Sequence, residues 1–482
     1  LIGCVVILLL LLSNYIIYFE LSAITISIVF IISIITLVIL YNFSVDKLLN
    51  FFIFLLVLYP KKPISAEWTN KFLNEILVEA NFSETIGFFD FFILPIFSII
   101  LFIKAYKSYY KPNIEIYSGY LIVLLFVLGY VITIMTNSIN DHVFSNTTVL
   151  SLTRITLILL FSSQILIIPS LLIFKKLLIK KVSLFENLII FLIFLLSFEL
   201  LIFSLGVLPV GIISQIVDWR EGYRSIFFGF SVWVGFFMLL GFCVSIIKFI
   251  KSKKLFYLVT AFLSINIQLL TFDRGPLLAS FIFIILIIVL KYKWKSVLGF
   301  IIILPIFISL NSKIYNLIQE SDVSKVKSSG FFSTESTIDR IGIQFRYIDA
   351  IIDNYFLPAG IKTNTTFYKK DINRNFNFTN DLKTPYNNFS SVKLTGSHNL
   401  LVQFAFDIGF ASFIMYVIII GKQIISNFRR KNYNYYVFGI SVLIFYLFQA
   451  DPNYYFLPIM MFIFSSNYID PRSKYNSLGY KK

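Results

Sequence analysis

The chain has 482 residues, of which 58% are hydrophobic and only 14% are charged. Soluble domains carry about 25% charged residues, and a soluble fold has too little interior to bury such an apolar excess. Composition therefore excludes soluble enzymes, nucleic-acid binders and disordered proteins, and it predicts an integral membrane protein. The formal net charge is +16. Its basic residues are scattered between apolar runs, which favours positions beside lipid headgroups over a nucleic-acid surface.

A membrane-spanning helix needs about 20 mainly apolar residues. The apolar runs predict an all-α, polytopic integral membrane protein with about 12–14 transmembrane helices. The first run, Leu1–Phe19, lacks the basic region and small-residue cleavage site of a signal peptide, so we interpret it as a membrane helix. The predicted spans are Leu1–Phe19, Leu21–Tyr41, Leu48–Leu58, Ile86–Tyr106, Gly119–Thr136, Thr153–Phe174, Asn187–Leu208, Ser225–Ile250, Leu255–Phe272, Pro276–Leu290, Ser296–Leu310, Asn399–Gly421, Tyr435–Phe448 and Tyr454–Ser465.

Lysine and arginine cluster after alternate spans, which predicts the orientation of the chain because cytoplasmic loops retain basic residues. The segment Asn137–Thr148, on the opposite side, contains neither residue. Lys61 and Lys62 break the alternation near a short span, so the first quarter of the chain is the least defined by this pattern. The basic groups are Lys104/Lys107/Lys111, Lys175/Lys176/Lys180/Lys181, Lys248/Lys251/Lys253/Lys254, Lys291/Lys293/Lys295 and Lys422/Arg429/Arg430/Lys431.

This topology predicts three parts. A transmembrane bundle of about eleven spans occupies residues 1–312, a large extracytoplasmic loop 313–395, and membrane helices with a short cytoplasmic tail 396–482. Loops of this length are usually functional. Within this one, apolar residues recur at spacings of three and four, which predicts an amphipathic helix on the bilayer surface or packed over the bundle. Its apolar stripe consists of Ile338, Ile341, Phe345, Ile348, Ile352 and Tyr355.

Arginines predicted on the outer side are unusual, because the positive-inside rule disfavours them. Together they favour a site for an anionic, lipid-linked substrate, since guanidinium groups bind phosphate oxygens in pairs. Structural roles remain open. Arg274 could pair with its neighbour Asp273, and Arg346 with Asp349 one helical turn on. Of the two histidines, His142 has the character of a plain loop residue, whereas His398 stands directly before a span. The outer arginines are Arg220, Arg224, Arg274, Arg340 and Arg346, with Arg374 a further candidate.

Several kinds of site are not indicated. The sequence has no Asp-x-Asp pair for a metal–nucleotide-sugar complex and no phosphate-binding Gly-x-x-x-x-Gly-Lys-Ser/Thr loop. Cys4 and Cys243 both lie in apolar runs, and no cysteine–histidine spacing predicts zinc or a disulfide framework. Chemistry at the outer side is therefore expected to be metal-independent, with a pre-activated donor.

Three motifs in fixed order carry a resemblance to a known family. Thr271–Leu278 contains an Arg-Gly pair, Gly396–Leu401 contains a His-Asn pair, and between them an arginine-led helix at Arg346 ends in Leu357-Pro358-Ala359-Gly360. This order resembles the superfamily of O-antigen polymerases and O-antigen ligases across roughly residues 255–464. Ala359-Gly360-Ile361 departs from it, since a second glycine is common there.

The resemblance implies a metal-independent, cofactor-free glycosyltransferase of the bacterial cytoplasmic membrane that acts at its outer face. Arg274 and Arg346, with Arg220, Arg224 and Arg340 as further candidates, would bind the pyrophosphate of an undecaprenyl-pyrophosphate-linked glycan. His398 would be the general base, with Gly275, Asn399 and Gly360 supporting the motifs.

The preferred function is polymerisation of such repeat units into O-antigen or capsular polysaccharide, with lipid-linked glycans as donor and acceptor. A chain-length regulator and a flippase are further expected partners, and nucleic acid is not. Two alternatives stay open: an O-antigen ligase, which differs only in its acceptor, and a polysaccharide flippase or transporter. Transporters usually place charged residues near the membrane midplane, whereas here the charges lie at the ends of the predicted spans.

Overall fold

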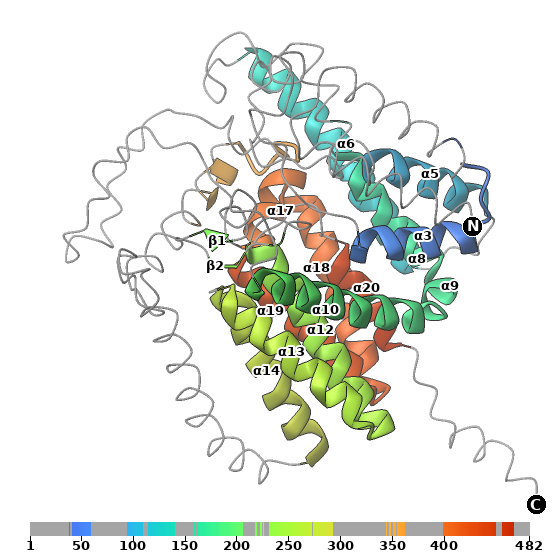
Figure 1. Ribbon diagram of the computed structural model, residues 1–482. Coiled ribbons are helices and arrows are strands. Elements are labelled where there is room, and N and C mark those ends of the chain that lie inside the picture. The colour runs from blue at the N-terminus through green and yellow to red at the C-terminus, as the bar shows by residue number, and fades with distance from the viewer. Residues whose placement is uncertain are drawn as a thin grey trace, which may run out of the picture.

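The computed structural model describes a helical protein over part of the chain (Figure 1). Leu1–Phe19 and Ser296–Leu310, most of Leu21–Tyr41 and most of the predicted loop 313–395 lie outside the described residues. The three domain boundaries therefore stay predictions. The described residues are 38, 41–58, 94–108, 114–139, 159, 162–205, 217–218, 222–223, 225, 231–271, 273–292, 344, 347–348, 350–352, 354–361, 399–449 and 456–466.

Nearly all the described elements are helices, which confirms the all-α class. The strands β1 (Val217–Asp218) and β2 (Gly222–Tyr223) form one short antiparallel pair. The helices of the first half are α3 (Val45–Leu58), α5 (Leu94–Lys107), α6 (Ile114–Ile139), the 3₁₀ turn η2 (Ser163–Leu166), α8 (Ile167–Ile173), α9 (Lys175–Ile179) and α10 (Val182–Ser204). Those of the second half are α12 (Ser231–Ser252), α13 (Leu255–Leu270), α14 (Arg274–Tyr292), α17 (Leu400–Ile408), α18 (Phe410–Arg429), α19 (Tyr433–Phe448) and α20 (Leu457–Ser465).

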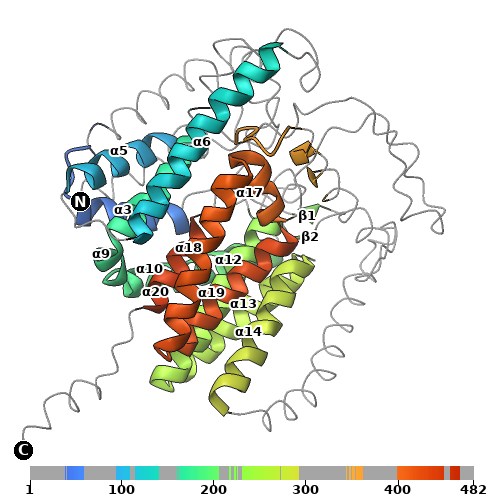
Figure 2. The same cartoon turned by 180° about the vertical axis from the view of Figure 1, so that it is seen from behind.

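Four of the described helices are long and apolar enough to cross a membrane, and this makes the chain a polytopic membrane protein. They are Ile114–Met135, Val182–Ile202, Val232–Ser252 and Phe410–Arg429, and shorter apolar helices accompany them. Every residue of α20 is buried, as expected for a helix that is apolar on all sides and lies inside a bundle. In contrast, α6 and α18 expose long apolar faces and pack against each other (Figure 2).

One end of the bundle gathers basic residues, and we call it the basic end. The Nζ atom of Lys251, near the end of α12, lies 4.9 Å from the ring centre of Tyr435 at the start of α19. Lys248 forms a 3.2 Å ion pair with Glu186 in the first turns of α10. The last turn of α18 also reaches this end, because the ring of Phe428 contacts Tyr433. The predicted cytoplasmic groups after α12 and α18 therefore lie together.

The opposite end carries the family motifs, and we call it the motif end. A Cβ atom at Gly235, near the start of α12, would lie 2.9 Å from the ring of Pro276, so α14 begins beside the start of α12. A Cβ atom at Gly275 would lie 3.5 Å from Gln449, which follows the last residue of α19. α17 enters the bundle at the same end, since it precedes α18, whose far end is basic (Figure 2).

Two predicted spans need correction. The span Asn399–Gly421 is not one helix but two, α17 and α18, separated by Gly409 with φ of 83°. The span Ser225–Ile250 differs at its first residue, because Ser225 forms a β-bridge, and α12 is described from Ser231. At Gly409, the hydropathy average runs across the break between two apolar helices.

Candidate functional site

For the predicted charged site residues, the structure describes mainly the neighbouring residues in the chain. Arg220, Arg224, Arg340, Arg346 and His398 lie outside the described residues, and Arg274 is described only by its backbone, as the first residue of α14. The supporting residues Gly275, Asn399 and Gly360 are described. These three, with the side chains around them, show how the sequence builds each motif and where each is placed.

The Arg-Gly motif begins α14 at a capped turn. The Asp273 carboxylate accepts a hydrogen bond of 3.2 Å from the backbone N–H of Gly275, which satisfies one of the free donors of the first helical turn. Gln449 Nε2 lies 3.5 Å from the same carboxylate oxygen. Thr271 Oγ1 donates to the carbonyl of Gln268 at 2.6 Å and closes the end of α13. This turn fixes the backbone from which Arg274 projects.

The His-Asn motif is the amino-terminal cap of α17. The Asn399 side-chain oxygen accepts hydrogen bonds from the backbone N–H groups of Leu401 and Val402, at 3.0 and 3.3 Å. Asparagine is among the best residues for this position, because its oxygen replaces the missing intrahelical acceptor. Asn399 thus fixes the residue at which α17 begins. His398 is the residue directly before this cap in the chain.

The Pro-Gly turn is docked on the break between α17 and α18. The last carbonyls of α17 have no partner within their own helix. Phe406 accepts from the N–H of Ala359 at 3.0 Å, and Asp407 accepts from the N–H of Gly360 at 2.9 Å. Gly360 has φ of 98°, a conformation that glycine adopts readily and other residues avoid. The helix break thus supplies the hydrogen-bonding groups that hold the turn.

The same segment packs its preceding helical turns against α17. Tyr347, which follows Arg346 in the chain, is fully buried, and its ring meets Phe406 edge-on with centres 5.1 Å apart. Ile351 lies in the same small cluster. The arginine-led helix and the helix that follows His398 are therefore neighbours. Ile348, Ile352 and Tyr355 of the predicted stripe are exposed, so these three residues do not pack over the bundle, which was one of the two predicted placements of the stripe.

A buried carboxylate that sequence reasoning missed lies at the motif end beside the β1–β2 hairpin. Glu199, near the end of α10, is only 6% exposed and accepts a hydrogen bond of 2.8 Å from Ser225 Oγ. The pKa of Tyr223 in β2 is raised well above its usual value by burial and then by the Glu199 charge. In the sequence, Arg220 stands between β1 and β2, and Arg224 stands between Tyr223 and Ser225. Glu199 therefore anchors the segment that carries both arginines.

Two further acids lie at the motif end: Asp273, which was considered from the sequence only as a partner of Arg274, and Asp407, whose burial was not predicted. Asp407 in α17 is fully buried and accepts from Gln403 Nε2 at 3.0 Å, and Asp273 caps α14. A carboxylate inside or beside an apolar span is a usable signal, because ionisable groups there are expensive and usually functional. Within the described ranges, no three His, Cys, Asp or Glu side chains group in a way that could hold a metal ion.

Comparison with known families gives one match that covers the three motifs. Residues 259–417, about a third of the chain, match the family model described as O-antigen ligase. No curated protein and no solved structure matches the chain significantly. The match includes the Arg-Gly turn, the Pro-Gly turn and the His-Asn cap, and it gives no support to a flippase or transporter. Over residues 259–417, the predicted resemblance to the O-antigen ligase and polymerase superfamily is confirmed.

Proposed function

We propose that the protein polymerises undecaprenyl-pyrophosphate-linked oligosaccharide repeat units at the outer face of the bacterial cytoplasmic membrane. The supporting observation is the arrangement of the three motif scaffolds. The capped turn at Asp273–Gly275, the Asn399 cap and the Pro358–Gly360 turn all lie at the motif end, opposite the lysine-rich end. Basic residues mark the cytoplasmic side, so this arrangement favours an outward-facing site.

In this proposal a hydroxyl of one lipid-linked unit attacks the anomeric carbon of the other. His398 accepts the hydroxyl proton, the new glycosidic bond forms, and the bond to the pyrophosphate breaks. The leaving group is undecaprenyl pyrophosphate, whose charge Arg274 and Arg346 stabilise, with Arg220, Arg224 and Arg340 as further contributors. A positioned base contributes about 10²–10⁴-fold in rate, and loss of one charge-stabilising donor costs about 10²–10³-fold.

The asparagine cap supports this role for His398, because Asn399 caps α17 directly after His398 in the chain. An imidazole is suited to the role of general base, since its pKa range is near neutral pH.

The test is complementation of a strain that lacks its own polymerase, read as a glycan ladder on a gel. The wild-type chain should restore the ladder. His398→Ala and Arg274→Ala should each give only single capped repeat units, with the protein still present in the membrane. His142→Ala and Arg429→Ala are matched controls of the same residue types and should give full ladders.

Two outcomes would contradict parts of the proposal. Full ladders from both His398→Ala and Arg274→Ala would remove the site assignment. Rescue of a strain lacking its O-antigen ligase, without rescue of the polymerase-deficient strain, would replace polymerisation by transfer to a different acceptor.

A further inference from the structure

Two consecutive aromatic residues at the motif end have a left-handed backbone. Tyr355 and Phe356 have φ of 54° and 61°. They end the helical turns at 350–352, because the N–H of Phe356 donates to Ile351 at 2.8 Å and that of Tyr355 to Ile352 at 2.9 Å. This is the hydrogen-bond pattern of a Schellman cap, in which Tyr355 takes the position usually occupied by glycine. A Cβ atom makes this conformation unfavourable, yet the chain places a large aromatic side chain there.

The ring of Tyr355 does not pack into the core, since 70% of the residue is exposed. It forms part of an exposed apolar surface that we call the ledge, made of Ile348, Ile352, Tyr355, Phe356 and Phe410. The rings of Phe356 and Phe410 are 5.5 Å apart, so the ledge joins the turn to the first residue of α18. The opposite side of the same segment is buried on α17 through Tyr347 and Ile351.

The ledge continues the lipid-facing surface of α18. From Phe410 onward, exposed apolar residues recur at helical spacing along this candidate span, at Ile414, Val417, Ile418, Ile425 and Phe428. A helix of 20 residues is about 30 Å long, which is the thickness of the hydrocarbon core. Phe410 therefore lies at the hydrocarbon boundary on the motif side. Aromatic side chains are enriched at that depth.

We infer that the ledge inserts into the boundary between headgroups and acyl chains of the membrane leaflet at the motif end. The lipid bilayer is its partner, and the left-handed turn is retained because it presents both aromatic rings to that surface. With respect to the proposed function, the contact holds the turn that follows Arg346 at headgroup depth, where the pyrophosphate of a lipid-linked glycan lies. The lipid contact itself does not depend on that function.

Spin labels report the surroundings of the ledge directly. Ile352→Cys and Tyr355→Cys are labelled in a Cys4→Ala, Cys243→Ala background and reconstituted in vesicles of phosphatidylethanolamine and phosphatidylglycerol. Relaxation by oxygen, which partitions into lipid, is compared with relaxation by a water-soluble nickel chelate. Ile418→Cys on the lipid face of α18 and Ser252→Cys at the basic end are the reference positions, and both residues are exposed.

Labels at 352 and 355 should show an oxygen-to-nickel ratio several-fold above that of the Ser252 label and below that of the Ile418 label, because Ile418 lies about 12 Å further along α18 from the boundary. A ratio equal to that of the Ser252 label would overturn the inference, because the ledge would face water. Protection from both reagents would also overturn it, since another protein segment or a second copy would then cover the surface. The readout needs no glycan substrate, so a failed polymerisation test and a failed lipid contact are separate results.

Discussion

Replacing Gly409 with alanine tests whether the helix break positions the Pro-Gly turn. Gly409 has φ of 83° and ψ of 153°, a region that only glycine adopts readily. An added Cβ would lie 2.8 Å from Cδ and 2.9 Å from the backbone nitrogen of Pro358. The backbone conformation costs about 1–3 kcal/mol, and overpacking costs about 1–3 kcal/mol. Together the expected destabilisation is about 2–6 kcal/mol.

Because the clash is with one docked turn, part of this cost can be avoided by releasing the turn from α17. We therefore expect lower resistance to chemical unfolding in detergent together with a shortened glycan ladder. Gly421→Ala in α18 is the matched control, since a Cβ there meets nothing within 4 Å and alanine stabilises a helix interior by about 0.5–1 kcal/mol. Equal unfolding curves for Gly409→Ala and Gly421→Ala would refute the reasoning.

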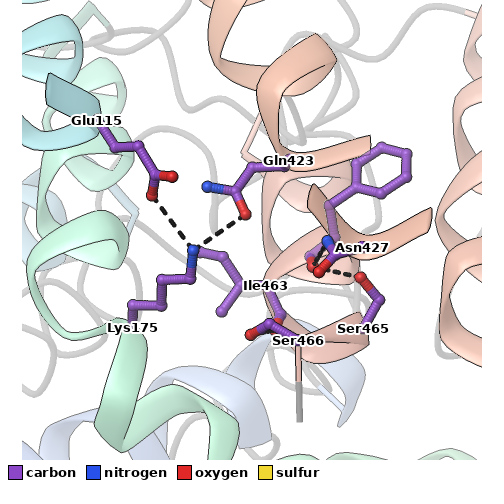
Figure 3. Close-up of polar contacts among 8 residues, drawn as sticks. Glu115, Lys175, Gln423, Asn427, Ile463, Ser465 and Ser466 are labelled. Atoms are coloured by element: carbon purple, nitrogen blue, oxygen red, sulfur yellow. Dashed lines mark hydrogen bonds and ion pairs between the residues drawn. The ribbon is translucent and has the colours of Figure 1, made fainter. Parts of the chain in front are cut away.

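Three further substitutions test other contacts. Asn399→Ala should cost about 0.5–2 kcal/mol by removing the α17 cap, and Asn399→Ser should restore both thermal stability and the ladder; failure of serine to do so would argue against capping. Lys175→Met removes the ion pair with Glu115 and the hydrogen bond to Gln423, at 3.2 and 3.1 Å (Figure 3), and should lower the free energy of unfolding by about 1–3 kcal/mol. Lys422→Met, at the exposed residue beside Gln423, is the control and should change it by no more than about 0.5 kcal/mol. The raised pKa of Tyr223 means that folded-state stability is lost as pH rises above the usual value of 10.0; Tyr223→Phe should flatten that loss in thermal unfolding scans, and an unchanged slope would contradict the cause given.

The helices were predictable where hydropathy alone decides them. The predicted spans Leu255–Phe272 and Tyr435–Phe448 lie within two residues of α13 and α19 at each end. The clustering of basic residues at one end was equally readable, because the positive-inside rule acts on local sequence. The fold class follows from such local signals summed along the chain.

The break at Gly409 and the orientation of the stripe were not predictable, because both depend on contacts distant in sequence. Gly409 adopts its conformation where Pro358 packs against it, and periodicity cannot report that. The same periodicity identified an amphipathic segment but not its buried face. In the sequence, Ile352 and Tyr355 are as suitable for a buried face as Tyr347 and Ile351. Only the packing of this segment on α17 shows that Tyr347 and Ile351 are the buried pair.

The candidate site was partly readable. The outer arginines follow from residue type and topology, and the ordered motifs follow from the family resemblance, whereas the burial of Glu199 and Asp407 emerges only once α10 and α17 are packed. Asn399 is an intermediate case. An asparagine before an apolar run is a recognised helix-start signal. The structure shows that the Asn399 side chain caps the first turn of α17.

Pro358 contacts both a helix outside the segment that matches the family model and a glycine inside that segment. Its ring leaves no room for a Cβ at Gly129 in α6, where the added atom would lie 2.7 Å away, or at Gly409. Its carbonyl accepts from Thr133 of α6 at 2.9 Å. Yet α6 precedes the segment that matches the family model. A chimaera that joined residues 259–417 to the amino-terminal helices of a relative would therefore need a residue without a side chain at the position of Gly129. Amino-terminal and carboxy-terminal halves are in this sense constrained to diverge together.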